Sequence, residues 1–155
     1  MPNINTIFQH LGGAKYFSTF DLASGYYQFK MRECDIEKTA FATPEGLYEF
    51  VRMPMGLSNA PATFQRAMTN IFANMVYHGV MVFIDDILVY SKTWKEHMEK
   101  LEEVLRRMKE NNLQAKVAKC HFAQPQTQYL GYVITANAKR PDPAKVKAIQ
   151  QMRTP

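Results

Sequence analysis

The sequence predicts an α+β fold in which helices pack on one face of an antiparallel sheet. Segments rich in β-branched and aromatic residues, which favour strands, alternate irregularly with amphipathic segments of helical period. Several predicted strands follow one another across short turns, which indicates hairpins and an antiparallel sheet. A chain of 155 residues with 46% hydrophobic and 21% charged residues is long enough to form one globular domain with its own core.

In the first half of the chain, local signals define each expected element. A cap residue followed by proline, at Asn59-Ala60-Pro61, predicts the start of a helix. Apolar residues at spacings of three and four give this helix a buried face of Phe64, Met68, Ile71, Phe72 and Met75. Before it, we expect a short helix at 3–11, a strand at 15–21, a helical turn at 24–30 and a hairpin of 38–44 with 47–53 around Pro44-Glu45-Gly46.

The second half is expected to begin with another hairpin, at 79–91, in which two strongly apolar runs flank a short turn. After Ser91 a long amphipathic helix is predicted to run to about Asn111. Its predicted buried stripe consists of Trp94, Met98, Leu101, Val104, Leu105 and Met108. Further strands are expected at 114–122 and 128–135, and Asp142-Pro143 predicts the start of a final helix that stops at Pro155.

The turn of the second hairpin carries two adjacent carboxylates, Asp85 and Asp86, between two apolar runs. In isolation, Asp-Asp is an ordinary turn signal, and that is the simpler interpretation. A third carboxylate, Asp21, ends the strand predicted at 15–21. If these strands are neighbours in one sheet, the three carboxylates converge. An oxygen-rich site of that kind suits Mg²⁺, which also takes ligands from substrate phosphates.

The formal net charge of +5 is concentrated toward the C-terminus. From Asn112 onward the chain has seven basic residues and one acidic residue, so this region carries a net charge of +6. A one-sided basic region is typical of a surface that contacts a phosphate backbone, and we predict Lys116 and Lys119 among those contacts. A solvated surface without a partner would explain the same charge.

Other features of the composition favour structural roles. The chain has no apolar run of the roughly 18 residues that a membrane span needs, and no membrane partner is expected. Two distant cysteines, Cys34 and Cys120, indicate a reducing compartment rather than a disulfide. The histidines show no mutual spacing that suggests catalysis, and we interpret His10, His78, His97 and His121 as structural.

Several motifs occur in a fixed order along almost the whole chain. They are Leu11-Gly12-Gly13-Ala14-Lys15-Tyr16-Phe17-Ser18, Phe20-Asp21-Leu22 with Ser24-Gly25-Tyr26, Thr39-Ala40-Phe41, Met53-Pro54-Met55-Gly56-Leu57-Ser58-Asn59-Ala60-Pro61-Ala62-Thr63-Phe64-Gln65, Phe83-Ile84-Asp85-Asp86, Tyr129-Leu130-Gly131-Tyr132-Val133-Ile134 and Pro141-Asp142-Pro143-Ala144-Lys145-Val146. With this ordered set, the chain resembles the palm of a reverse transcriptase from the Gypsy group of long-terminal-repeat retrotransposons. The resemblance implies a ferredoxin-like polymerase palm, with part of the fingers and the start of the thumb.

The resemblance also implies a role for individual residues. Asp21, Asp85 and Asp86 would be catalytic and would hold two Mg²⁺ or Mn²⁺ ions, because phosphoryl transfer requires in-line positioning and charge neutralisation. The nucleotide-binding residues would be Leu22, Ala23, Tyr26 and Met55, and the primer and template contacts would be Gly56, Leu130 and Gly131 together with Lys116 and Lys119. Tyr26 would exclude ribonucleotides by blocking the 2′-hydroxyl, although the same residue also fits a core tyrosine.

Three functions follow as hypotheses. The first is an RNA-directed DNA polymerase core, which would act on a primed RNA or DNA template with deoxynucleoside triphosphates. The second is a non-catalytic module of the same fold that binds nucleic acid or a protein partner. The third is a metal-dependent nuclease, against which Tyr26 and the motif at 53–65 argue.

The expected domain spans 1–155 as palm with part of the fingers, and 141–155 as the start of the thumb. We expect the chain to be a piece of a Pol polyprotein whose fingers, thumb and ribonuclease H segments lie outside it. Exposed faces for those parts would favour homo-oligomers. Such an enzyme is expected to be intracellular, either cytoplasmic in a virus-like particle or nuclear.

Overall fold

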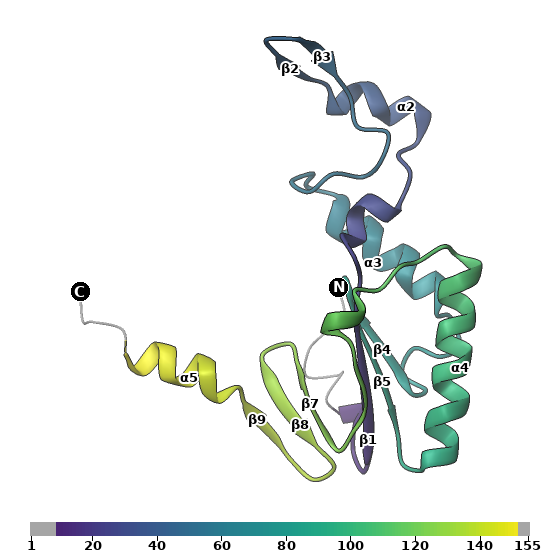
Figure 1. Ribbon diagram of the computed structural model, residues 1–155, viewed down its shortest axis with the longest axis vertical. Helices are drawn as coiled ribbons and strands as arrows, with labels where there is room; N and C mark the ends of the chain where they lie inside the picture. Colours follow the sequence, from purple (N-terminus) through teal and green to yellow (C-terminus); the bar gives the residue numbers. More distant parts are fainter. Residues whose placement is uncertain (1–8, 152–155) are drawn as a thin grey trace.

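The computed structural model describes residues 9–151, which form a central antiparallel sheet with helices on one face, a three-stranded sheet beside it and a two-stranded sheet that projects away from it (Figure 1). The strands are β1 (Tyr16–Asp21), β2 (Phe41–Thr43), β3 (Gly46–Tyr48), β4 (Val80–Phe83), β5 (Asp86–Ser91), β6 (His121–Gln124), β7 (Gln126–Tyr129), β8 (Tyr132–Thr135) and β9 (Lys139–Pro141). The α-helices are α2 (Glu33–Ile36), α3 (Ala60–Ile71), α4 (Trp94–Glu110) and α5 (Pro143–Gln150). The structure also has the 3₁₀ turns η1 (Gly25–Gln28), η2 (Glu37–Thr39) and η3 (Val117–Lys119).

The central sheet has the strand order β4-β5-β1-β6, and its neighbouring strands are antiparallel. Successive side chains of a strand point to opposite faces, so the strands of this sheet contribute side chains to two hydrophobic cores, one on each face. On one face, Phe20, Ile87 and Val89 pack with side chains from α3 and α4. On the other face, Phe17 and Leu88 pack with Tyr129 and Ile134 from the sheet β7-β8-β9. The predicted fold class, an antiparallel sheet with helices on one face, is confirmed.

The apolar stripe predicted for the long helix is only half correct. Leu101, Val104 and Met108 of α4 are buried, whereas Trp94, Met98 and Leu105 are about half exposed. The buried face instead begins at His97, which is fully buried. A helix of this length buries one narrow stripe against a sheet, so large apolar residues on its flanks remain in contact with water.

His97 is buried because each of its ring nitrogens has a hydroxyl partner. Its Nε2 lies 2.8 Å from Ser18 Oγ on β1, and its Nδ1 lies 3.0 Å from Ser91 Oγ at the end of β5. Ser18 Oγ also accepts a hydrogen bond from the Ala123 amide in β6. Burial lowers the pKa of His97, so the imidazole is neutral near pH 7. The structural role predicted for this histidine is therefore confirmed, and it ties α4 to the central sheet.

Two strand predictions near the C-terminus are wrong in detail. The segment expected to be one strand at 114–122 is interrupted by the turn η3. Ala115 forms an isolated bridge with Leu22, and the strand β6 begins only at His121. The segment expected at 128–135 forms two strands of a hairpin, because Leu130 and Gly131 adopt positive φ values of 50° and 79° that reverse the chain. A leucine at such a position gives no sequence signal of a turn.

The hairpin of β2 and β3 projects away from the central sheet, at the opposite end of the molecule from the β7-β8 hairpin (Figure 1). Leu47, Val51 and Met55, in and after this hairpin, are more than 60% exposed. The hairpin predicted around Pro44-Glu45-Gly46 is confirmed, with shorter strands than expected.

The ends of the predicted elements are limited by the described part of the chain. Most of the helix expected at 3–11 lies outside the described residues, as does the end of the final helix beyond 151. Within residues 9–151, the helices are all too short or too polar to cross a membrane.

Candidate active site

Asp21 and Asp86 lie directly opposite each other at the same end of the central sheet. Asp21 is the last residue of β1, Asp86 is the first residue of β5, and the antiparallel register pairs the two. Asp85 occupies the turn that joins β4 to β5, and its carbonyl accepts a hydrogen bond from the Leu22 amide at 3.4 Å. The two acidic segments, 64 residues apart in the sequence, therefore meet at one edge, as the sequence predicts for neighbouring strands.

The electrostatics of Asp86 show how closely the three carboxylates interact. Burial raises the pKa of Asp86 to about 6, and the negative charges of Asp85 and Asp21 contribute to the rise. Lys119 opposes the effect without cancelling it. Like charges that raise a pKa in this way mark a site with excess negative charge, which is a candidate functional site on physical grounds.

A consequence for stability follows from this raised pKa. The pKa of Asp86 is about 6 in the fold and near 3.8 when unfolded, so its contribution to stability is complete below about pH 3.8 and is lost as the pH rises through 6. We therefore expect Asp86→Asn to unfold at a higher temperature than the parent chain at pH 8, with a smaller difference at pH 5. Thermal unfolding at both pH values measures this. In Asp85→Asn, a carboxyl NMR titration should show a lower pKa for Asp86; an unchanged value would contradict the convergence.

The turn that carries Asp85 is held by a buried glutamine of α3. Gln65 Oε1 accepts a hydrogen bond from the Ile84 amide at 2.8 Å, and its Nε2 donates to the Val82 carbonyl at 3.0 Å. Ile84 has a φ of 53°, in the left-handed region that a β-branched residue rarely adopts. The amide of Gln65 thus fixes a strained turn from both sides, which sets where Asp85 projects.

The donor set of this edge fits a divalent cation. The side chains are oxygen ligands with excess negative charge, and Lys119 already places an ammonium group 3.1 Å from Asp21 Oδ2. Both groups are partly exposed, so a metal ion could replace this ammonium group from solvent. Within residues 9–151, however, side chains of His, Cys, Asp and Glu do not form a group of three arranged to hold a metal ion. The site thus has the ligand chemistry for a metal, and its carboxylates would need to reorient around one.

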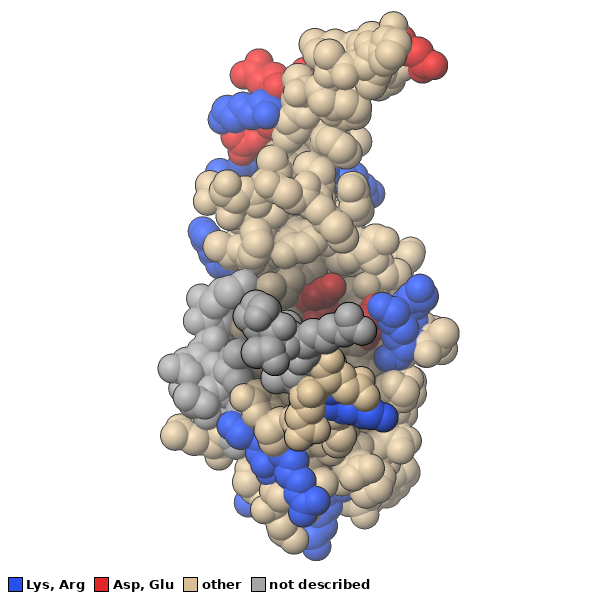
Figure 2. All heavy atoms as spheres, turned by 90° about the vertical axis from the view of Figure 1, so that its left-hand side faces the viewer, with Lys and Arg blue, Asp and Glu red and all other residues tan. Residues whose placement is uncertain are grey.

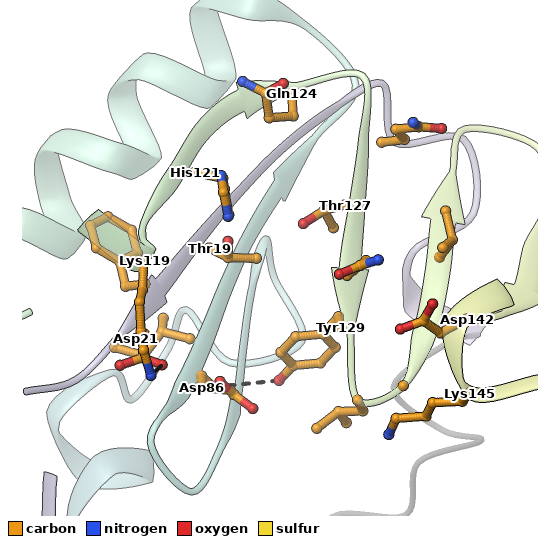
Figure 3. Close-up of a pocket in the computed structure, with 17 residues that line it drawn as sticks. Thr19, Asp21, Asp86, Lys119, His121, Gln124, Thr127, Tyr129, Asp142 and Lys145 are labelled. Carbon is orange, nitrogen blue, oxygen red and sulfur yellow. Dashed lines mark hydrogen bonds and ion pairs between the residues drawn. The ribbon is translucent and has the colours of Figure 1, made fainter. Parts of the chain in front are cut away.

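A polar pocket of about 550 Å³ opens beside Asp21 and Asp86 (Figure 3). It lies between the central sheet and the β7-β8 hairpin, and Leu130, Gly131 and Lys119 line it. Tyr129, which is buried, donates a hydrogen bond from its hydroxyl to the Asp86 carbonyl at 3.5 Å. Two predicted primer contacts and one predicted basic contact therefore share a pocket with two of the carboxylates.

The turn after Asp21 uses its amides differently from the sequence expectation. The resemblance implies that Leu22 and Ala23 bind the nucleotide, which their backbone amides could do by lying against its triphosphate. In the structure the Leu22 amide donates to the Asp85 carbonyl and the Ala23 amide donates to the Gln114 carbonyl at 2.9 Å. These two amides therefore hold the turn in place.

The other predicted residues lie in two places. The Tyr26 ring packs at a tilt against the Phe64 ring, with 5.0 Å between the ring centroids. Burial and the charge of Asp85 raise the pKa of Tyr26. The Lys116 amide donates to the Asp21 carbonyl at 2.8 Å while its side chain is exposed. Met55 is exposed and Gly56 has a φ of 95° with open space around it, in the loop between β3 and α3. These last two residues do not line the pocket beside Asp21 and Asp86.

Sequence reasoning missed three residues that shape this site. Gln65 was noted only as part of a motif, although a glutamine on the buried face of an amphipathic helix is itself a signal of a buried hydrogen-bonding role. A side chain at Gly25 would begin 3.0 Å from Phe64 and 3.3 Å from Asp85, so a larger residue would have to push these two side chains aside. The role of Tyr129 depends on the tight turn at Leu130-Gly131, where Gly131 is a residue typical of turns but Leu130 is not.

Comparison with known proteins agrees with this geometry. The family model for reverse transcriptase, described as an RNA-dependent DNA polymerase, matches residues 1–134. The chain belongs to the reverse transcriptase family. Among its relatives, a retrovirus-related Pol polyprotein from transposon opus of Drosophila melanogaster is 46% identical over the whole chain, and the one from transposon gypsy of the same organism is 37% identical. The chain spans 16% and 15% of the lengths of these two polyproteins.

Solved structures show the same fold. A foamy viral protease-reverse transcriptase in complex with double-stranded DNA matches all of this chain and 27% of its own, with a TM-score of 0.87 and 25% sequence identity. Another, in complex with an RNA/DNA hybrid, covers 91% of this chain and 19% of its own, with a TM-score of 0.82 and 27% identity. The resemblance identified from the sequence motifs is confirmed.

Proposed function

We propose that this chain is the catalytic palm of an RNA-directed DNA polymerase, part of a retrotransposon Pol polyprotein. The observation that carries the proposal is the meeting of Asp21, Asp85 and Asp86 beside a polar pocket, in a chain of the reverse transcriptase family. In this proposal residues 1–155 form the palm with part of the fingers, and 141–155 begin the thumb. A retrotransposon enzyme of this kind would act inside the cell, in a cytoplasmic particle or in the nucleus.

Asp21, Asp85 and Asp86 are proposed to be the residues that would hold two Mg²⁺ or Mn²⁺ ions. Bound there, the ions would lower the pKa of the attacking 3′-hydroxyl and neutralise charge on the triphosphate. Lys119 would leave Asp21 and turn toward a phosphate. Gln65, through the turn at Ile84, keeps Asp85 at the edge where Asp21 ends.

Primer extension tests the proposal directly. The chain, together with the fingers and thumb of its parent polyprotein, is expected to extend a DNA primer on an RNA template with Mg²⁺ and deoxynucleoside triphosphates. The chain alone should extend far more slowly, because substrate positioning contributes several kcal/mol of rate acceleration, on the order of 7–11 kcal/mol in favourable cases. Binding of primer and template without any extension by the complete enzyme would favour a non-catalytic module instead.

Tyr26 is proposed to select deoxynucleotides. Its ring packs against Phe64, and the charge of Asp85 acts on its hydroxyl. The ring would therefore be held in a fixed position near Asp85. Tyr26→Ala is expected to raise incorporation of ribonucleotides relative to deoxynucleotides by about tenfold or more, because an added hydroxyl would no longer collide with the ring. The ratio of the two kcat/KM values in the complete enzyme measures this. Tyr26→Phe, which keeps the ring, serves as the control and should retain the parent ratio.

Nucleic acid is the proposed macromolecular partner. Of the two similar solved structures, one is a complex with an RNA/DNA hybrid and the other is a complex with double-stranded DNA. Figure 2 shows acidic atoms in a hollow at mid-height, with Lys and Arg atoms gathered beside and below it. This distribution would attract phosphate backbones to the rim while leaving negative charge at the centre for cations.

Salt dependence should report on this contact. The logarithm of the affinity for primer–template is expected to fall with the logarithm of the salt concentration, with a slope of about −0.9 per phosphate neutralised on duplex DNA. Lys116→Gln combined with Lys119→Gln should reduce the slope by nearly two such units if both lysines contact phosphates. Fluorescence anisotropy at several salt concentrations measures the slope; Lys95→Gln with Lys109→Gln, on α4, is the matched control and should leave it unchanged.

A further inference from the structure

The side-chain amide of Gln28 occupies an unusual position between two backbone segments of the site. Residues 21–23 pair with residues 114–116 through hydrogen bonds from the Lys116 amide to the Asp21 carbonyl and from the Ala23 amide to the Gln114 carbonyl. Regular antiparallel pairing would add a return bond from the Gln114 amide to the Ala23 carbonyl. The structure has no such direct bond between these two described groups.

Gln28 is inserted where that return bond would be. Its Oε1 accepts from the Gln114 amide at 2.8 Å, and its Nε2 donates to the Ala23 carbonyl at 2.7 Å. The same Nε2 also donates to the Gln114 carbonyl at 2.9 Å. One side-chain amide therefore satisfies both backbone groups, next to the direct bond from the Ala23 amide to the Gln114 carbonyl.

The inserted amide lies between functional parts of the site. One segment continues from Asp21, and the other leads to Lys119, whose ammonium pairs with the Asp21 carboxylate. Gln28 is also the last residue of η1, the turn that contains Tyr26, and its own carbonyl accepts a hydrogen bond from Arg52 at 2.8 Å. Ser24, with a φ of 52°, turns the chain away from the ladder so that Gln28 can reach back to it.

We propose that Gln28 is a positioning residue that sets the spacing between the turn after Asp21 and the segment that carries Lys116 and Lys119, and so sets nucleotide affinity. Without the inserted amide, the Ala23 carbonyl and the Gln114 amide would pair directly or with water, and Tyr26 would lose its anchor to the central sheet. The effect on nucleotides rests on the proposed function, whereas the insertion itself does not.

Two variants of equal size separate the contributions of the amide. Gln28→Met removes both donor and acceptor, and Gln28→Glu keeps an acceptor for the Gln114 amide but places a carboxylate against the carbonyls of Ala23 and Gln114. Tyr27→Phe is the matched control, because Tyr27 lies on the exposed side of the same turn. Circular dichroism and thermal unfolding establish that each variant folds.

Amide hydrogen exchange of the full chain is the first measurement. In Gln28→Met, exchange at Gln114 is expected to become about tenfold faster, the factor that corresponds to one lost hydrogen bond. Amides in the middle of α4 should be unaffected, and Tyr27→Phe should match the parent chain throughout. Unchanged exchange at Gln114 in Gln28→Met would overturn the insertion, whatever the enzymatic result.

Nucleotide binding is the second measurement, made by titrating a deoxynucleoside triphosphate with Mg²⁺ into the chain. Gln28→Met is expected to weaken this binding by about tenfold, and in the complete enzyme KM should rise by a similar factor with little change in kcat. A purely structural role would lower kcat through the folded fraction and leave KM unchanged, which would overturn the positioning role. If the proposed function itself is wrong, the parent enzyme will be inactive as well, which distinguishes that outcome from an effect of Gln28→Met alone.

Discussion

Asp85→Asn is expected to abolish primer extension, with a loss of kcat of about 10³-fold or more. The carboxylate lies at the turn that meets Asp21, where it adds negative charge to the environment of Asp86. Asparagine has nearly the same shape, so the fold should be retained while the charge that attracts the metal ions is lost. Removing a single electrostatic contact of this kind costs about 10²–10³ in rate even without a metal, and loss of a metal ligand should cost at least that.

The measurement is single-turnover extension of a labelled primer by the complete enzyme. Asp35→Asn is the matched control, because it makes the same chemical change away from the pocket. Asp35 pairs with Lys38 on the projecting part of the fold. Affinity for primer–template should change little in either variant. An Asp85→Asn enzyme with more than about a tenth of the parent rate would remove Asp85 from the catalytic set, given the size expected for such a group.

Gln65→Met is expected to damage both stability and activity. The variant leaves the Val82 carbonyl and the Ile84 amide without their side-chain partner, and Gln65 itself is only 7% exposed. Each of these two buried polar groups left unpaired costs about 1–3 kcal/mol, so the free energy of unfolding should fall by roughly 2–6 kcal/mol. Misplacement of Asp85 by about 1 Å should also reduce kcat on the order of 10²-fold.

Thr69→Val is a control that distinguishes the bonds of Gln65 to the turn from its bond within α3. Thr69 accepts a hydrogen bond from Gln65 at 3.3 Å but does not bond the turn, so its replacement should cost little rate. Denaturant unfolding gives the stability of each variant, and metal titrations of the rate show whether the loss in Gln65→Met follows a higher requirement for Mg²⁺. Full activity in a destabilised Gln65→Met variant would show that the turn at Ile84-Asp85 keeps its geometry without the hydrogen bonds of Gln65.

Much of the fold and the core of the site could be predicted because their signals are local. The two strands that carry Asp21 and Asp85-Asp86 are short apolar runs with acids at their ends, and the edge at which they meet follows from antiparallel pairing. The helix from Ala60 was predictable from its cap and proline. The turn at Leu130-Gly131 was not, because its leucine adopts a conformation that glycine or asparagine would usually supply.

Residues that act through the backbone were the hardest to foresee. Gln28 and Gln65 bond main-chain groups 86 and 19 positions away, respectively, and neither contact has a residue-type pattern in the sequence. The same holds for His97, whose burial depends on serines of two different strands. Sequence reasoning located the charged groups of the site, whereas the uncharged groups that support them became visible only in three dimensions.

The ion pair between Lys119 and Asp21 has a practical consequence for how the protein can be handled. The carboxylate has a counter-ion supplied by the chain itself, and the described residues hold no buried side-chain nitrogen or oxygen without a hydrogen-bond partner. The core of the central sheet is built from apolar side chains, whose packing needs no metal ion. Folding therefore does not require a bound metal ion, unlike in small domains whose folding free energy is supplied by zinc. Chelators should leave the melting temperature nearly unchanged, and any metal requirement seen in an assay then reports on chemistry.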